Sequence, residues 1–500
     1  MLDKLLNRYS NFLAWFGILG MGILYSFMSV NNLRLFEIMG WDLGVFDHGI
    51  WQWSRFIFPY STFHELYWLA DHFHLILLTL VPFYWIWPNV RVLLISQGIL
   101  VALGAYPLYL LSKRVTKQNL FGLVVVAGYL LYYSLQRHIF AGFHELSFLP
   151  LTLGFVMYFW ETKKTKPYWL FFALSLLVKE EVGFLLAAFG LWGLLTDRTR
   201  WKQAALSIVL GLITTLGLIF VVMPQIGGSS YLHAGFGVIG DTPEKILATL
   251  ASNPFVLVRA FVDSPIKIKT MFTNFWPWGF LPLFSPSTLI LAIQQYALRF
   301  LDYGKVIRWT PDFAYSLPLA TITAWGSIYG FRNLIVIFRK KFGKNTKLLG
   351  ITVSLIVLAL ILAQQVRLHS PINSIFKRAF YRTEKWMEDN NKVLKCVPPN
   401  VSVSAQNSLG AWLSERKKIK VFPEGLLQGY DYLVVDLHSG QSEDSFYFFG
   451  SKNTNFVIDD LIKRNLYKVV CQEGRAMVLK RVADTTGKLN YPFELDVYER

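Results

Sequence analysis

Long apolar runs, separated by short polar segments, fill most of the first 370 residues of this chain. Several runs extend for about 17 to 25 residues with charges only at their ends, the length at which an α-helix crosses a bilayer. The pattern therefore predicts about eleven membrane-spanning helices. They are expected near residues 11–31, 90–112, 118–135, 146–161, 167–180, 182–196, 203–223, 270–300 (two shorter helices, broken at Pro282 and Pro286), 313–332 and 348–365.

The composition agrees with this mainly α, polytopic class. Hydrophobic residues make up 54% of the chain and charged residues only 16%, against about 25% charged in soluble proteins. The first apolar run follows Lys4 and Arg8 and is too long for the core of a signal peptide. We therefore expect an uncleaved first helix and an integral membrane protein whose partner is the lipid bilayer.

Four short basic segments between the apolar runs predict the orientation. They span 113–117, 163–166, 198–202 and 339–347, and such loops are normally cytoplasmic. The N-terminus is then cytoplasmic and the C-terminal region lies outside the plasma or inner membrane. Because the net charge of +17 is concentrated in these loops, we expect no nucleic acid partner.

Two longer segments, at about 32–89 and 225–269, fall on the outer side in this topology. The first contains LILLTLVPFYWIWP (75–88), which is too short to span and is expected to form an interfacial or re-entrant helix. In the second, Thr242 as N-cap and Pro243 at the first helical position predict an amphipathic helix. The tryptophans of the first segment are expected to form an interfacial belt. They are Trp51, Trp53, Trp68, Trp85 and Trp87.

The pattern changes near residue 370, which predicts two domains, 1–369 in the membrane and 370–500 outside it. Short β-branched runs alternate with helical ones and predict a small α/β domain. These runs are VSVSA (401–405), IKVF (419–422), YLVVDL (432–437), YKVVCQ (467–472) and AMVLKR (476–481), the last two joined as a hairpin. Cys396 and Cys471 are expected either to form one disulfide in the oxidising compartment or to remain two separate thiols. The domain has no catalytic constellation in its sequence.

Acidic, basic and histidine residues gather at the predicted outer turns. Charged groups at membrane depth are costly and tend to be functional, so we expect one shared site. The candidates for donor or substrate binding are His72, Arg137, His144, Glu145, Lys179, Glu180, His233 and Tyr315. The structural alternatives are helix capping by the nearby aspartates, ordinary interfacial histidines and a Lys179–Glu180 ion pair.

The segment GWDLGVFDHGIWQW (40–53) supplies the candidate catalytic residues. Either Asp42 or Asp47 is positioned to act as a general base on an acceptor hydroxyl. Asp42 lies nearer the first helix, whereas Asp47 has His48 beside it. A divalent metal held by Asp47, His48 and Glu145 is a second use of these residues.

The order of several motifs resembles a family of predicted polytopic membrane proteins of unknown function within the GT-C glycosyltransferase superfamily. These motifs are WDLGVFDHGIW, LADHFHLILLTLVPFYWIWPNVRVLLISQG, GFHELSFLPL, LSLLVKEEVGF, YLHAGFGVIG, WGFLPLFSPS and PPNVSVSAQNSLGAWLSER. The resemblance implies a GT-C-like fold and transfer of a sugar from a polyprenyl-phosphate donor on the outer side, usually with inversion.

The same resemblance implies roles for individual residues. Asp42 or Asp47 matches the superfamily's aspartate after the first helix, and Glu145 matches a second acid in the next outer turn. The family more often has His-Pro-Glu where this chain has Phe-His-Glu at 143–145. The acceptor is not implied.

Two other functions compete with a glycosyltransferase. A polytopic transporter or flippase of a lipid-linked or polar substrate would also concentrate polar groups among helices, but no internal repeat is visible. A membrane-anchored binding module would place the function in residues 382–500.

Overall fold

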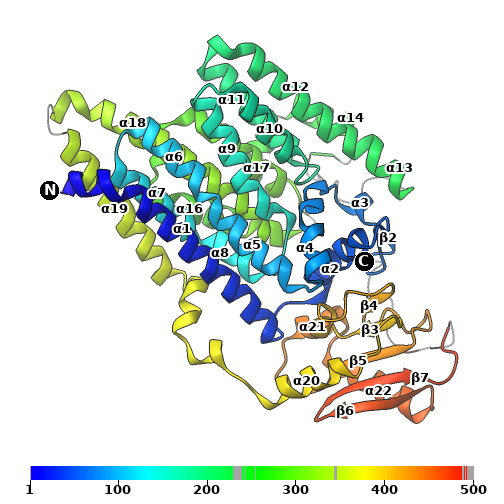
Figure 1. The fold of residues 1–500 in the computed structure, drawn as a ribbon. Helices are drawn as coiled ribbons and strands as arrows, with labels where there is room; N and C mark the ends of the chain where they lie inside the picture. Colours follow the sequence, from blue (N-terminus) through cyan, green and yellow to red (C-terminus); the bar gives the residue numbers. More distant parts are fainter. Residues whose placement is uncertain are drawn as a thin grey trace.

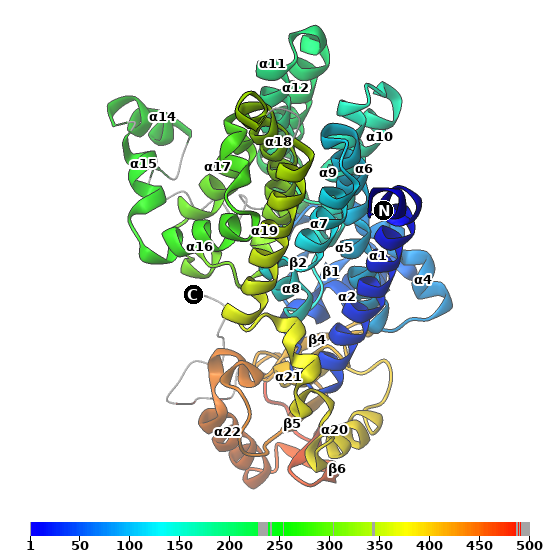
Figure 2. The ribbon, with the colours of Figure 1, turned by 90° about the vertical axis from the view of Figure 1, so that its left-hand side faces the viewer.

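The computed structural model describes residues 2–228, 239–240, 243–253, 255–303, 305–342, 346–486, 489 and 491. A helical body comes first along the chain, and a small sheet with its helices follows (Figure 1). Figure 2 shows the sheet region below the helical body, next to the segment that contains α2. The expected polytopic helical fold with a C-terminal α/β region is confirmed.

A helix occupies each stretch for which the apolar pattern predicts a crossing. The helices of the body are α1 (Leu2–Arg34), α5 (Arg91–Leu103), α6 (Ala105–Thr116), α7 (Asn119–Leu130), α8 (Tyr133–Phe140), α9 (Leu149–Glu161), α10 (Thr165–Leu176), α11 (Val182–Thr196), α12 (Trp201–Gly217), α13 (Met223–Gly227), α16 (Pro265–Phe275), α17 (Leu289–Phe300), α18 (Leu317–Phe342) and α19 (Thr346–Arg367). Within the described residues, five helical runs are long and apolar enough to cross a membrane: 8–34, 91–116, 119–140, 198–227 and 346–367. The total of about eleven crossings stays a prediction.

Glycines let α11 and α12 approach backbone to backbone. A Cβ at Gly183 would lie 2.3 Å from the carbonyl oxygen of Gly211, and one at Gly211 would lie 2.4 Å from the carbonyl oxygen of Gly183. Small residues at such crossings are characteristic of helix packing in membranes. The close pair fixes the start of α11, and with it the turn that precedes this helix.

The first outer segment folds into short elements that do not span. They are η1 (Gly40–Gly44), α2 (Val45–Ser54), β1 (Tyr60–Ser61), β2 (Leu66–Tyr67), α3 (Trp68–Asp71), η2 (Leu75–Leu80) and α4 (Val81–Ile86). In α4 the side chains of Phe83 and Ile86 are exposed, at 53% and 84%, as expected for a helix lying at the membrane interface. Interfacial helices in this segment are therefore confirmed.

One of the five tryptophans expected in the interfacial belt, Trp68, does not lie at the surface. Trp68 is 1% exposed, and its ring centroid lies 4.2 Å from that of His74 and 5.0 Å from that of Trp53. Its large apolar surface is covered by the folded loop instead of by lipid, because β1, β2 and α3 bring the chain back over α2.

The second outer segment contains the helix expected after Pro243, α14 (Pro243–Ser252), followed by α15 (Phe255–Val262). Its predicted N-cap, Thr242, lies outside the described residues. Between α16 and α17 the chain makes short 3₁₀ turns through Pro282 and Pro286, as the break in the apolar run predicts.

The C-terminal region forms a five-stranded sheet in the order β4-β3-β5-β7-β6. Its elements are α20 (Lys385–Lys395), β3 (Val403–Ala405), α21 (Asn407–Gly410), β4 (Ile419–Val421), β5 (Tyr432–Asp436), α22 (Ser451–Lys463), β6 (Tyr467–Glu473) and β7 (Ala476–Arg481). β3 pairs in parallel with β4 and β5, whereas β7 pairs antiparallel with β5 and β6. All five expected strands and the final hairpin are present.

Cys396 and Cys471 form a disulfide that ties the end of α20 to β6. Of the two alternatives that the sequence left open, the bridged one is the one found. A structural disulfide is typical of an oxidising compartment, which agrees with the predicted extracytoplasmic position of this region.

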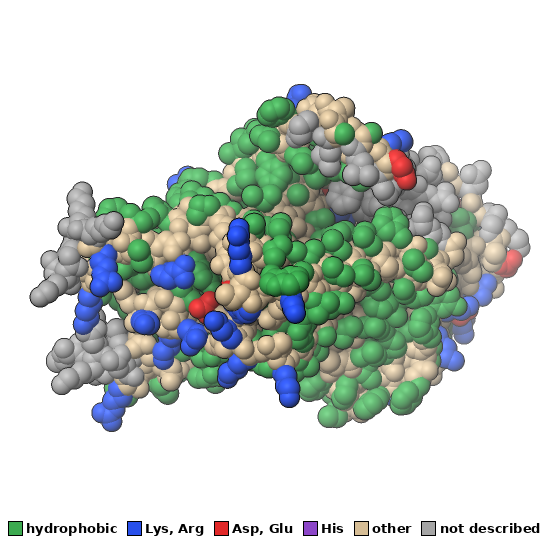
Figure 3. Space-filling model, turned by 90° about the horizontal axis from the view of Figure 1, so that it is seen from above, with side chains coloured by type: hydrophobic (Ala, Val, Ile, Leu, Met, Phe, Trp, Pro, Cys, Tyr) green, Lys and Arg blue, Asp and Glu red, His purple; other side chains and the backbone are tan. Residues whose placement is uncertain are grey.

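Basic side chains are unevenly distributed over the surface. Figure 3 shows Lys and Arg gathered at the left-hand end of one face, the side on which Figure 1 places the N-terminus, with hydrophobic side chains over much of the rest. The C-terminal sheet lies toward the opposite side in Figure 1. This separation agrees with a basic cytoplasmic face, and the orientation of the termini stays a prediction.

The disulfide gives a direct test of that orientation. In cells, we expect neither cysteine to react with a maleimide-polyethylene glycol reagent until the protein is reduced, and we expect Cys396→Ser to free Cys471 for labelling. The same substitution should lower the free energy of unfolding by about 2–4 kcal/mol, since the bridge closes a long loop. Labelling of both cysteines in unreduced wild-type protein would contradict the extracytoplasmic assignment.

Candidate functional site

The turn that carries Asp42 is fixed against the C-terminal region. A Cβ at Gly40 would lie 2.7 Å from the Cα of Gly410, so only glycine allows η1 to approach α21 this closely. The backbone N–H of Trp41 donates to Oδ1 of Asn407 over 2.9 Å. The GWDLG stretch is therefore held by residues more than 360 positions away in the sequence.

Asp47 is fully buried and both of its oxygens are hydrogen-bonded. The hydroxyl of Tyr84 donates to Oδ1 over 2.5 Å, and the hydroxyl of Ser414 donates to Oδ2 over 2.6 Å. Nδ1 of the neighbouring His48 lies 3.0 Å from the carbonyl oxygen of Ser414. Asp47 and His48 thus connect α2 to the C-terminal region, and their polar atoms are turned toward the protein.

Glu415 makes this contact dependent on pH. Burial, followed by the negative charge of Asp47, raises the pKa of Glu415 above its ordinary value. Burial also raises the pKa of Asp47, although the hydrogen bonds from Ser414 and Tyr84 partly oppose the shift. Two neighbouring acids that both resist ionisation keep a proton in the folded protein at pH values where free carboxyl groups have lost it.

Asp42 lies in a different environment. It is half-buried, and among the described residues its carboxylate makes no hydrogen bond or ion pair. Burial raises the pKa of Asp42, and the nearby His144 and His64 oppose that shift through their charge. Asp42 is therefore accessible, close to two imidazole rings and available to accept a proton.

The predicted outer turns come together around one ion pair. Nζ of Lys179, in the turn between α10 and α11, lies 3.0 Å from Oε1 of Glu145, at the start of η3 (Glu145–Phe148). The two side chains are only 8% and 2% exposed. A buried pair of this kind joins two turns that lie 34 positions apart in the sequence.

Glu180 attaches the first outer segment to the same turn. Its Oε1 lies 2.8 Å from Nδ1 of His72, and its Oε2 accepts the backbone N–H of Phe73 over 3.0 Å. The hydroxyl of Thr215 in α12 donates to the carbonyl oxygen of Glu180 over 2.7 Å. Contacts from three separate elements thus hold Lys179 and Glu180 in place. The alternative prediction was an ion pair between Lys179 and Glu180; Lys179 pairs with Glu145 instead.

A polar network behind Glu145 sets the position of the 142–147 turn. Oε1 of Gln97, a fully buried side chain of α5, accepts the backbone N–H of His144 over 3.1 Å and the hydroxyl of Ser147 over 2.9 Å. Nε2 of His138 lies 2.8 Å from the same hydroxyl. The turn is therefore held without the proline that the family more often has there.

Charge dominates the ionisation of the cluster. Burial by itself would raise the pKa of Glu145, but Lys179 and three histidines outweigh it and lower the pKa to about 2. For Lys179, burial is outweighed by Glu145, Glu181 and Glu180, and its pKa is raised. His74 has a pKa of about 4 because burial disfavours its charged form. The pair is ionised and His74 is neutral near pH 7.

A second group of cations lies beside this cluster, around η10 (Ala314–Ser316). Arg308 lies over the ring of Tyr315, 5.1 Å from its centroid, and its guanidinium is 2.8 Å from Asp302. Tyr315 in turn interacts electrostatically with Lys179. Arg137 and Asp312, both partly exposed, are 3.7 Å apart, and Tyr133 donates a hydrogen bond to Asp312.

The structure therefore brings together most of the residues singled out in the sequence. His72, His144, Glu145, Lys179 and Glu180 form one cluster, with Asp42 and Tyr315 at its edges. Arg137 lies with Asp312 at the neighbouring turn, and Asp47 and His48 face the C-terminal region instead. His233 lies outside the described residues.

The residues predicted to hold a metal do not fit one. Both oxygens of Asp47 and Nδ1 of His48 already have protein partners, and Glu145 is paired with Lys179. Within the described ranges, no three His, Cys, Asp or Glu side chains are grouped as a metal site requires. A divalent metal stays a prediction, and the side chains proposed as its ligands do not support it.

Sequence reasoning missed four residues near these groups: Arg299, Arg308, Ser414 and Glu415. Arg299 is 4% exposed and donates to the carbonyl oxygens of Arg308 and Thr310, while its Nη1 has no hydrogen-bond partner within the described ranges. A cation at the end of the apolar run 289–300 is the signal that would have identified it. Ser414 and Glu415 carry no such signal, because only the folded chain brings them to Asp47.

Comparison with known proteins agrees with this architecture. Residues 33–447 match the model of a family described as "Predicted membrane protein (DUF2079)". The fold is similar to crystal structures of ArnT from Cupriavidus metallidurans. The structure bound to undecaprenyl phosphate has 12% identity and a TM-score of 0.50, covering 94% of this chain and 98% of that one. The apo structure has 12% identity and a TM-score of 0.47, covering 94% and 99%. No curated protein sequence matches the chain.

The Asp47–Glu415 contact gives a stability prediction. Unfolded, the two acids ionise near their ordinary pKa values of 3.8 and 4.5; folded, they keep their protons to higher pH, so they reduce stability as pH rises above about 4. Glu415→Gln removes this penalty. We expect it to raise the melting temperature at pH 8 by about 2–4 °C, with little change at pH 4.

The matched control is Glu388→Gln on the exposed surface of α20, which should change neither value. Thermal unfolding of the detergent-solubilised protein at several pH values measures the effect. For each protein, the quantity compared is the change in melting temperature between pH 4 and pH 8. If this change is the same in Glu415→Gln as in the wild type, the two acids are not coupled.

Proposed function

Because the chain belongs to the DUF2079 family of predicted membrane proteins and shares its fold with ArnT, we propose that it is a membrane glycosyltransferase. In this proposal a sugar is transferred from a polyprenyl-phosphate donor to an acceptor hydroxyl on the extracytoplasmic side. The crystal structure of ArnT bound to undecaprenyl phosphate supports a lipid phosphate as one partner. The identity of the sugar is left open.

The contrast between the two aspartates is the observation that carries the proposal. Asp47 has each oxygen hydrogen-bonded and is completely buried. Asp42 is half-buried, without a hydrogen-bond partner among the described residues, and near His144 and His64. A general base needs a carboxylate that its substrate can reach, so we assign the base to Asp42 and a structural role to Asp47.

The proposed step balances as an inverting displacement. The carboxylate of Asp42 takes the proton of the acceptor hydroxyl as its oxygen attacks the anomeric carbon of the sugar. A bond forms between that oxygen and carbon while the bond from carbon to the phosphate oxygen breaks. Polyprenyl phosphate leaves with the electron pair, and no co-reactant is required.

Cations beside the cluster are suited to the leaving phosphate. Lys179 stays charged, because the surrounding acids raise its pKa. Arg308 lies over the ring of Tyr315, and Arg299 also interacts electrostatically with Tyr315. Nη1 of Arg299 has no hydrogen-bond acceptor among the described residues. Fixed positive charges where negative charge develops lower the barrier for this kind of transfer.

The remaining members of the cluster act by position. Glu145 pairs with Lys179 and limits the net charge of the site, and Glu180 holds His72 and the backbone of Phe73. His144 lies next to Asp42 and contributes to the local potential. No step is assigned to a metal, since the predicted ligands do not fit one.

We expect Asp42→Asn to lower the rate of transfer by about 10²–10⁴-fold, because the general base is lost. Asp47→Asn should retain far more activity at equal amounts of folded protein, while lowering stability. Asp197→Asn, which removes an aspartate from the basic loop before α12, serves as the control. The measurement is release of polyprenyl phosphate from a panel of polyprenyl-phosphate-linked hexoses and pentoses, with envelope membranes as acceptor.

The pH dependence of the same reaction adds a test of the assignment. Only ionised Asp42 accepts a proton, so activity should fall as pH decreases through its pKa, which burial places above the ordinary 3.8. Full activity of Asp42→Asn, with this acid limb unchanged, would exclude Asp42 as the base.

Lys179→Met and Glu145→Gln both break the buried ion pair, but only Lys179→Met removes the positive charge. Comparing the two variants therefore separates the structural effect of the pair from phosphate binding. Both should lower stability, by roughly 3–5 kcal/mol where a buried partner is left unpaired. Only Lys179→Met should also raise the KM for the lipid-phosphate donor by about tenfold or more, since a charge-assisted hydrogen bond is lost. Equal KM values in the two variants would remove Lys179 from the donor site.

A further inference from the structure

A cavity of about 400 Å³ lies between the end of α1 and the C-terminal sheet. One wall is formed by the segment after α1, with Phe36 and Glu37. The other wall comes from the C-terminal region and includes Arg382, Trp386, Ser408, His438 and Asp444. This size is typical of small-molecule sites, which measure about 300–1,000 Å³. The cavity lies beyond the carboxyl ends of the parallel strands β3 and β5, where open α/β sheets usually bind ligands.

A histidine on the wall is held in one orientation. Nδ1 of His438 lies 2.7 Å from Oδ2 of Asp436, and the backbone N–H of His438 donates to Oδ1 over 3.0 Å. In the tautomer that donates from Nδ1 to this carboxylate, the lone pair of the ring lies on Nε2. Across the part of the chain that the structure describes, Nε2 of His438 has no hydrogen-bond partner.

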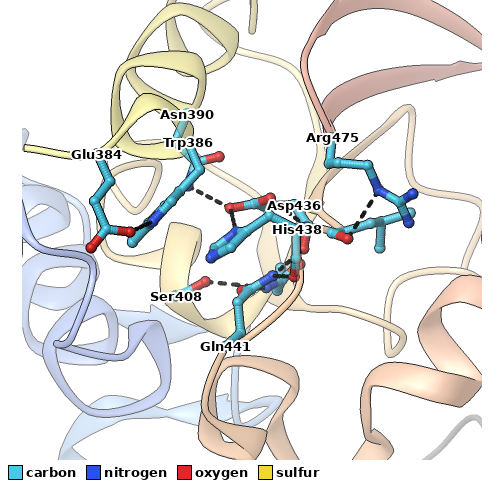
Figure 4. Close-up of polar contacts among 10 residues, drawn as sticks. Glu384, Trp386, Asn390, Ser408, Asp436, His438, Gln441 and Arg475 are labelled. Atoms are coloured by element: carbon cyan, nitrogen blue, oxygen red, sulfur yellow. Dashed lines mark hydrogen bonds and ion pairs between the residues drawn. The ribbon is translucent and has the colours of Figure 1, made fainter.

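A network beneath His438 makes this arrangement rigid (Figure 4). Nδ2 of Asn390 donates to Oδ2 of Asp436 over 2.7 Å, and Nε2 of Gln441 donates to the carbonyl oxygen of Asp436 over the same distance. Nε2 of Gln406 donates to Oε1 of Gln441, also over 2.7 Å. The ring of Trp386 stacks on His438 with centroids 4.2 Å apart and planes at 15°. Such support is what positions a functional side chain precisely.

The wall of the cavity carries both hydrogen-bond acceptors and hydrogen-bond donors. In that tautomer His438 offers an acceptor at Nε2, and the exposed carboxylate of Asp444 makes no hydrogen bond or ion pair with the described residues. Ser408 accepts from Nε2 of Gln406 over 3.3 Å, so its own hydroxyl hydrogen is available to donate. Neighbouring hydroxyl groups, which both donate and accept, satisfy this pattern.

Charge argues against an anionic ligand. The cation on the wall, Arg382, is already 2.9 Å from Glu37 and 3.4 Å from Glu384. No described trio of His, Cys, Asp or Glu forms a metal site here either. Trp386 and Phe36 add aromatic surface, with ring centroids 5.8 Å apart, and apolar ring faces pack well against the C–H groups of a neutral polyol.

We propose that this cavity is a carbohydrate-binding site in which His438, Ser408 and Asp444 bind hydroxyl groups and Trp386 with Phe36 provides the aromatic wall. The proposal is independent of the reaction assigned to Asp42. The ligand class is a neutral mono- or disaccharide unit, free or as part of a larger glycan.

Saturation-transfer difference NMR on the full chain tests this site. The probes are the methyl glycosides of glucose, galactose, mannose, N-acetylglucosamine and arabinose, together with maltose and cellobiose. The protein is kept in an amine-oxide detergent, because maltoside or glucoside detergents would present sugar head groups of their own. We expect at least one probe to bind, and His438→Asn and Ser408→Ala each to weaken binding by about tenfold, the effect of losing one hydrogen bond in a buried site.

His369→Asn is the matched control, since His369 is exposed and outside the cavity wall, and it should bind the probe as wild type does. Thermal unfolding shows which variants are folded, and Ser408→Ala, which removes only a hydroxyl, keeps the test valid if His438→Asn is unstable. No binding of any glycoside by the wild type overturns the proposal. So does binding that neither cavity variant weakens.

Discussion

The buried ion pair between Lys179 and Glu145 organises the outer face of this protein. Its two side chains, 3.0 Å apart and almost completely covered, join the turn between α10 and α11 to the turn before α9. Removing two charges from water is costly unless each has a partner and further hydrogen bonds. Hydrogen bonds of Glu180 with His72 and Thr215, and of Gln97 with the backbone of His144, hold the turns that carry the two charges. The pair therefore joins the turn before α9 to the turn before α11 and keeps a positive charge in the cluster that also contains His144, the neighbour of Asp42.

A second constraint comes from the C-terminal region, which locks the first outer segment in place. Gly40 packs on Gly410, Asn407 binds the backbone of Trp41, and Ser414 binds Asp47. The two aspartates of one short motif thereby receive opposite environments. Asp47 connects α2 to the C-terminal region, whereas Asp42, the base in the proposed reaction, makes no hydrogen bond or ion pair with the described residues. The function proposed for the membrane domain thus depends on residues that fold outside it.

The sequence predicted the parts of the fold that follow local periodicity. Apolar runs gave a helix at each expected place, and β-branched runs gave all five strands of the C-terminal sheet. The clustering of the outer turns also followed from topology alone, because basic loops on one side leave Glu145, Lys179 and Glu180 together on the other. Trp68 was placed wrongly, since burial by a returning loop is a tertiary effect that composition does not record.

Other features depend on contacts between distant segments, so no local pattern reveals them. Ser414 contacts Asp47 across 367 positions, and this contact is what gives Asp47 an environment different from that of Asp42. The Asp436–His438 pair was missed because two residues of that type, two positions apart, are common at strand ends. Only the cavity beside them, whose second wall comes from the segment directly after α1, distinguishes them from ordinary surface residues.

In the proposed reaction a lipid phosphate lies near Asp42, and a cryo-electron microscopy structure of the full chain with undecaprenyl phosphate tests this position. We expect phosphate density within hydrogen-bonding distance of Lys179, Arg308 or Arg299, on the face that carries Asp42, and we expect the prenyl chain to leave toward the bilayer. Phosphate density at the basic loops of the opposite face, with none near Asp42, would contradict this expectation.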